Sequence, residues 1–145
     1  MTIHRFIIGI DPGTNTGLAI WDRQTNDFYF VGTLQIHDAL HYIRVKHDYD
    51  YFQKNCLIRC ENPNTWRPFG KQDKSDRSKL QGAGSVKRDF AIWQDFAKGI
   101  GIPFESVNLQ SSMKKLKAER FEQITGYNKR TSEHARDAAM LCFKY

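Results

Sequence analysis

One short apolar run near the N-terminus constrains the fold more than any other segment. Residues 6–10 (Phe-Ile-Ile-Gly-Ile) are typical of a strand that is buried on both faces. The run stops at Asp11, and Pro12-Gly13 predicts a tight turn directly after it. Two further strand-like runs follow across short polar stretches, at residues 16–21 and 28–33. Three strands joined by short turns predict an antiparallel meander.

The rest of the chain alternates helical and extended patterns. With 145 residues, it is expected to form one α/β domain over residues 1–145. Residues 62–84 have no apolar period and are predicted to be a long loop. A fourth strand is expected to run parallel to the first, because a helix connects it to the meander. The predicted elements are a helix at 37–47, strands at 57–60 and 103–107, a helix at 85–100, a basic helix near 111–125, and a final helix from Thr131-Ser132 to 145.

Basic residues exceed acidic ones and gather in two segments. The chain carries 22 lysines and arginines against 16 aspartates and glutamates, a net charge of +6. Segments 65–90 and 111–130 each carry a net charge of +4, so the remainder is slightly acidic. Two basic patches on such a body indicate a polyanionic partner, with nucleic acid favoured over an acidic membrane surface. The alternative is a solvated face that keeps the protein soluble.

The cysteines and the hydropathy pattern indicate a reducing, aqueous compartment. Cys56 and Cys60 lie too far apart in an extended segment for a disulfide, so these thiols and that of Cys142 are expected to be free and buried. The first apolar run is too short for a signal peptide, and no run reaches the ~20 residues of a membrane helix. We therefore expect a cytoplasmic protein with no membrane partner.

Acidic residues end two of the predicted strands. Asp11 follows the first strand and Glu61 the fourth, and an acid at the end of a buried strand needs a cation or hydrogen-bond donors. His134 and Asp137 lie three residues apart on the last helix, so both can face the same strand ends. Hard oxygen ligands favour Mg²⁺ or Mn²⁺. Taken singly, Asp11 could cap the turn after it, and the His-x-x-Asp pair could be a surface pair.

The order of these motifs resembles the RuvC-type Holliday-junction resolvases of the ribonuclease H-like superfamily. The resemblance rests on residues 8–14 (Ile-Gly-Ile-Asp-Pro-Gly-Thr) with 17–19, on 58–61, and on 133–139. It implies a five-stranded mixed sheet, with three antiparallel and two parallel strands, flanked by helices. It also implies a homodimer that resolves four-way DNA junctions by paired nicks, leaving 5′-phosphate and 3′-hydroxyl ends.

The resemblance further implies a catalytic metal site with two Mg²⁺ ions, for which Mn²⁺ can substitute. The family's four metal-site positions, which are also its catalytic positions, fall here on Asp11, Glu61, His134 and Asp137. The third is commonly an aspartate in the family, so His134 is a departure. The chain is also shorter than we expect of cellular members, which fits a phage-type enzyme acting in a bacterial or phage-infected cytoplasm.

The resemblance and the basic segments together predict a DNA-binding surface. In the family, an aromatic side chain near the loop after the second acidic strand end can wedge into an opened junction, and Trp66 and Phe69 are available for this. Local packing of these rings is the alternative, although an exposed ring among basic residues also suits stacking on a base. The predicted phosphate contacts are Arg67, Lys71 and Lys74 in the loop, Lys87 and Arg88 early in the long helix, and Lys114, Lys115 and Lys117 in the basic helix.

Other functions remain open at this point. The first motif also resembles the phosphate-binding hairpin of actin-like ATPases and sugar kinases, but the chain is too short for their two lobes and lacks a Walker-type phosphate loop. The His37-x-x-x-His41 spacing imitates a zinc-protease helix without a matching third ligand. A non-catalytic DNA-binding domain, or a related nuclease acting on RNA–DNA hybrids, transposon ends or other branched DNA, uses the same basic surface, because phosphate contacts carry no base information.

Overall fold

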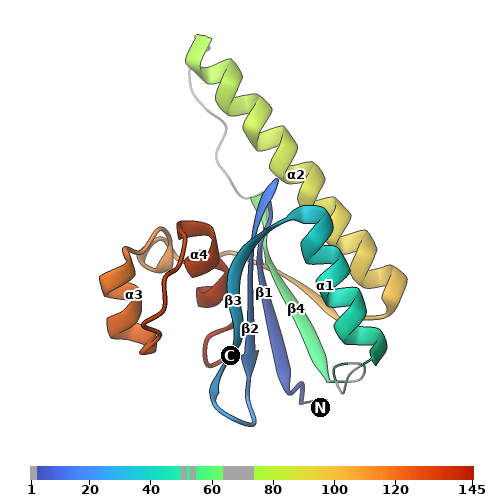
Figure 1. The fold of residues 1–145 in the computed structure, drawn as a ribbon. Coiled ribbons are helices and arrows are strands. Elements are labelled where there is room, and N and C mark those ends of the chain that lie inside the picture. The colour runs from blue at the N-terminus through green and yellow to red at the C-terminus, as the bar shows by residue number, and fades with distance from the viewer. Residues whose placement is uncertain (1–2, 50–51, 53–54, 64–73) are drawn as a thin grey trace.

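Five strands form one mixed sheet in the order β3-β2-β1-β4-β5 (Figure 1). The first three strands are the predicted antiparallel meander, and β4 and β5 continue the sheet in parallel with β1. Their bounds are β1 Phe6–Asp11, β2 Asn15–Asp22, β3 Asp27–Gln35, β4 Cys56–Glu61 and β5 Phe104–Val107. The structure is a computed structural model that describes residues 3–49, 52, 55–63 and 74–145. The predicted fold class is confirmed.

Helices cover both faces of the sheet (Figure 1). Alternate residues of β1 explain this, because Ile8 packs with α1 and α2 on one face while Ile7 packs with α3 and α4 on the other. The four helices are α1 Ile36–Tyr49, α2 Lys74–Ile100, α3 Ala118–Thr125 and α4 Glu133–Cys142. The three cysteines are free and buried, as predicted. Within the described residues, no helix is both long and apolar enough to cross a bilayer.

The long helix α2 begins earlier than the sequence predicts. Residues 74–84 were expected to belong to a loop, but they form the first part of α2. Figure 1 shows this part of the helix projecting past the end of the sheet where β1 and β4 finish. A helix that projects needs no apolar face, and extending an existing helix fixes few additional dihedral angles for each hydrogen bond gained. The expectation of a loop was therefore wrong for 74–84.

The predicted basic helix over 111–125 is also divided. A 3₁₀ turn covers Ser111–Met113, an irregular stretch follows, and α3 starts only at Ala118. Lys115 has a φ of 51°, in the left-handed region that a continuous helix excludes. The polar backbone and side-chain groups freed by this break reach the carboxylates described below.

Two glycines allow α4 to lie directly against the sheet. A Cβ atom added at Gly9 would lie 2.0 Å from the carbonyl oxygen of Ala138, and one added at Gly17 would lie 2.0 Å from that of His134. No real Cβ atom fits at such distances, so glycine is required at both positions. Small residues on the helix, Ala138 and Ala139 among them, complete the close approach.

Candidate active site

The two acidic strand ends lie side by side. The parallel register of β1 and β4 pairs Ile10 with Cys60, so Asp11 and Glu61 are the next residues on neighbouring strands. Both side chains are largely withdrawn from solvent, with exposed fractions of 13% for Asp11 and 8% for Glu61. The predicted convergence of these two carboxylates is therefore present in the fold.

Helix α4 adds the other two predicted site residues. Ser132 caps the helix by accepting a hydrogen bond from the amide of Ala135, as its residue type predicts. His134 is the second residue of α4, and its Nδ1 atom lies 2.9 Å from Oδ2 of Asp11. Asp137, one turn later, is buried. The His-x-x-Asp pair thus faces the strand ends.

Burial and mutual repulsion change the proton affinity of these acids. Burial is the largest cause that raises the pKa of Asp11 to about 7, and the charges of Glu61 and Asp137 raise it further, against the opposing hydrogen bond from His134. The pKa of Asp137 is raised by burial and by the charge of Glu61, against the hydrogen bond it accepts from the backbone of Lys115. Three carboxyl groups therefore share one low-dielectric region with less positive charge than they need.

This raised pKa predicts how stability depends on pH. Between pH 3.8 and about 7, the folded protein holds a proton on Asp11 that the unfolded chain releases, so the free energy of unfolding falls as pH rises through this range. We expect the melting temperature in EDTA to fall as the pH rises from about 5 to about 8. In Asp11→Asn, the loss of unfolding free energy over this pH range should be smaller by an amount on the order of 1–3 kcal/mol. Thermal melts followed by circular dichroism at several pH values measure both effects. The same dependence of stability on pH in the wild type and in Asp11→Asn would contradict the prediction.

The segment between β5 and α3 donates to two of the carboxylates. The ammonium Nζ of Lys114 lies 2.6 Å from Oε1 of Glu61. The backbone amide of Lys115 donates to Oδ1 of Asp137 over 2.8 Å. Adjacent residues therefore engage different acids of the site. Both lysines were predicted to contact phosphate, and their roles beside the acids were missed because no local pattern links them to residues so far away in the chain.

The donor set fits a hard divalent cation. Three carboxylates and one imidazole gather where burial and neighbouring negative charge raise the pKa of Asp11 and that of Asp137. A divalent cation bound among these oxygens would offset that negative charge. Their present partners are His134, Lys114 and the amide of Lys115. Among the described residues, no three His, Cys, Asp or Glu side chains already converge on one point as a metal site.

The structure describes six of the ten residues predicted to contact DNA. Lys87, Arg88, Lys115 and Lys117 are exposed, and Arg88 lies within 3.3 Å of Asp89 Oδ1. Lys114 is partly buried against Glu61. Lys74 is the first residue of α2. Trp66, Arg67, Phe69 and Lys71 lie outside the described residues. The assignment of these residues to DNA contacts stays a prediction.

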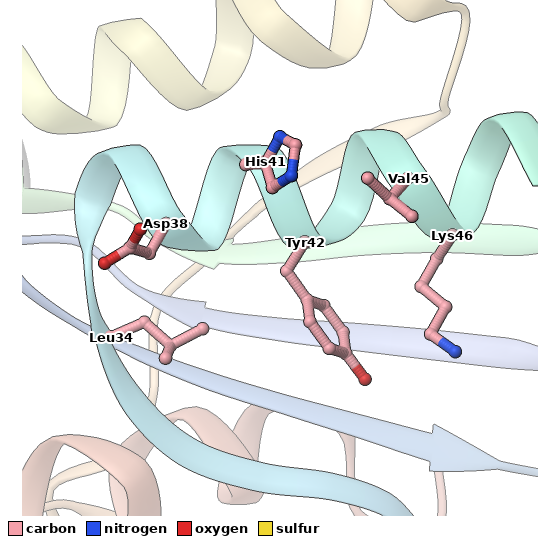
Figure 2. A pocket seen from close by; sticks show the side chains of 6 residues that line it. All are labelled: Leu34, Asp38, His41, Tyr42, Val45 and Lys46. Atoms are coloured by element: carbon pink, nitrogen blue, oxygen red, sulfur yellow. The ribbon is translucent and has the colours of Figure 1, made fainter.

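A separate groove lies between α1 and β3, on the sheet face opposite α4. Figure 2 shows Leu34 and Tyr42 in the space between helix and strand, and the lining residues are Leu34, Asp38, His41, Tyr42, Val45 and Lys46. None of the four site residues reaches it. The nearby His37 makes only an exposed contact of 3.5 Å with Asp38. The zinc-protease-like spacing of His37 and His41 thus belongs to no metal cluster among the described residues.

Comparisons with known proteins support the fold. No family model matches the sequence, and no curated protein matches it significantly. A solved structure of T. thermophilus RuvC in complex with Holliday junction substrate is similar in fold, with a TM-score of 0.58 and 16% sequence identity. The similarity covers 95% of this chain and 90% of that one. The chain therefore has the ribonuclease H-like fold of RuvC, with the four candidate residues gathered at one end of its sheet.

Proposed function

We propose that this chain is a divalent-metal-dependent endonuclease that cuts branched DNA, with four-way junctions as its preferred substrate. The observation that carries this proposal is the gathering of Asp11, Glu61, His134 and Asp137 at one end of the sheet. The fold similarity to RuvC, solved with a Holliday junction, supports the choice of substrate.

The carboxylates of Asp11, Glu61 and Asp137, with the imidazole of His134, would hold the ions. The chemistry that divalent ions would supply there is an activated water for in-line attack and stabilisation of the leaving oxygen. The chain's own groups orient the ligands. With Asp11 ionised, Nδ1–H of a neutral His134 donates to it, which leaves the Nε2 lone pair of His134 for a metal or a proton. The backbone amide of Lys115 likewise donates a hydrogen bond to the carboxylate of Asp137 and so orients it.

The exposed basic residues beside this site suit a phosphate backbone. Lys115 and Lys117 lie one and three residues after Lys114, which contacts Glu61. Lys87 and Arg88 lie on α2, whose first part projects past the same end of the sheet (Figure 1). Paired nicks on opposite strands need two sites, which a homodimer with two-fold symmetry supplies. We therefore include a homodimer in the proposal.

Lys117 provides a test of the DNA surface. If it neutralises a phosphate, Lys117→Ala should reduce the slope of log K against log salt for junction binding by about 0.9. Lys98→Ala is the matched control, because Lys98 is exposed in the last turn of α2, at the end of the sheet away from the site. Fluorescence anisotropy at several salt concentrations measures the slope. Equal slopes for the two variants would place Lys117 on a solvated face.

The proposed substrate is tested by a panel of labelled DNAs under single-turnover conditions. A four-way junction, a flap, a linear duplex and an RNA–DNA hybrid are each incubated with the protein and Mg²⁺. We expect fastest cleavage of the four-way junction. Faster cleavage of the hybrid would replace the proposal with a ribonuclease H activity. Tight binding of junctions without any cleavage would indicate a non-catalytic DNA-binding domain.

A further inference from the structure

The contact between Lys114 and Glu61 joins residues that are 53 positions apart in the chain. Its length of 2.6 Å corresponds to a direct, charge-assisted hydrogen bond. The side chain of Glu61 is only 8% exposed, whereas that of Lys114 is 32% exposed. The buried carboxylate of Glu61 thus receives its compensating positive charge from Lys114. The partly exposed side chain of Lys114 can move its ammonium into solvent.

The backbone around Lys114 is shaped to deliver this contact. The amide of Lys114 closes the 3₁₀ turn on Ser111, and the next residue, Lys115, adopts a left-handed conformation that non-glycine residues rarely take. In that conformation, the amide of Lys115 points to Asp137. A hydrogen bond to Asp137 thus holds Lys115 in the left-handed conformation, and the side chain of Lys114 contacts Glu61.

We propose that Lys114 is the resident cation of the metal-free site, that a divalent ion must displace its ammonium from Glu61, and that Lys114 therefore sets the metal affinity. This rests on the proposed function, because it takes Glu61 to be a metal ligand. An oxygen bonded to an ammonium at 2.6 Å must give up that bond to coordinate an ion fully, and the ammonium repels a dication nearby. The absence of a converged trio of ligands among the described residues agrees with this state.

The first experiment is a titration of the protein with Mn²⁺. The concentration of free Mn²⁺ at each point is measured by electron paramagnetic resonance. Lys114→Met keeps much of the side-chain volume and removes the charge, so it should tighten the strongest Mn²⁺ site by roughly fivefold or more. Lys129→Met is the matched control, because it removes the same charge from an exposed position that contacts no site carboxylate. Unchanged or weaker binding by Lys114→Met, beside normal binding by the wild type, would overturn the proposal.

The second experiment uses the wild-type protein, so it does not depend on how a variant folds. Reductive methylation, read residue by residue by mass spectrometry, reports how free each lysine ammonium is. We expect Lys114 to react slowly in EDTA and at least about threefold faster with saturating Mn²⁺, while Lys129 reacts equally in both. An equal rate for Lys114 in a protein that binds Mn²⁺ would overturn the inference and leave the proposed function standing. A wild-type protein that binds no Mn²⁺ would overturn both.

Discussion

Asp11→Asn is expected to reduce the rate of junction cleavage by more than about 100-fold. Changes to residues that merely support metal ligands cost about 10–100-fold, and Asp11 is a proposed ligand in its own right. It lies close to the other site residues, since the charges of Glu61 and Asp137 both raise its pKa and His134 is hydrogen-bonded to it. Junction binding should be unchanged or tighter, because a negative charge near the phosphates is removed and the basic surface is intact.

Single-turnover cleavage and anisotropy measure these two effects on the same junction. Asp38→Asn serves as the matched control, because Asp38 is an acid on α1 that lines the groove on the opposite face of the sheet. It should cleave at the wild-type rate. Cleavage by Asp11→Asn at the wild-type rate would remove Asp11 from the catalytic site and would leave its raised pKa without a functional explanation.

Gly17→Ala is expected to lower both stability and activity. The new Cβ would lie 2.0 Å from the carbonyl oxygen and 2.6 Å from the carbonyl carbon of His134, and both are backbone atoms that a side-chain rotation cannot move away. Helix α4 must shift, at a cost of about 1–3 kcal/mol. Because a displacement of about 1 Å can cost about 100-fold in rate, cleavage should fall by up to about this factor even at temperatures where the variant remains folded.

Gly99→Ala is the control for this substitution. Gly99 lies near the end of α2, and a Cβ added there meets no other atom within 4 Å. Alanine is a better helix former than glycine by up to about 1 kcal/mol, so the variant should melt at an equal or higher temperature and cleave normally. If Gly17→Ala melts and cleaves like the wild type, α4 is not held at the sheet by this contact.

The sequence allows the strands and their acidic ends to be predicted, because both depend on local patterns. A buried strand is mostly apolar, and the acidic residue at its end is visible in the sequence, as at Asp11 and Glu61. Only the register remains to be found, and the pairing of Ile10 with Cys60 supplies it. Ser132 as the cap of α4 is equally local.

Features that depend on long-range geometry could not be predicted. The first part of α2 projects beyond the sheet, and its sequence has no apolar period from which a helix could be predicted. The pairing of Lys114 with Glu61 depends on the path of the chain through a left-handed residue between β5 and α3. A basic residue in such a segment has the same sequence signature whether it binds phosphate or a buried carboxylate.

The most direct test of the central claim is the mapping of cleavage products from a four-way junction labelled on each strand. With Mg²⁺, the wild-type protein should produce nicks at symmetry-related positions on two opposite strands, with 5′-phosphate and 3′-hydroxyl ends that DNA ligase can seal. EDTA should abolish them, and Mn²⁺ should restore them. Products that form equally in EDTA, or an intact junction after prolonged incubation with the protein and Mg²⁺, would contradict the account.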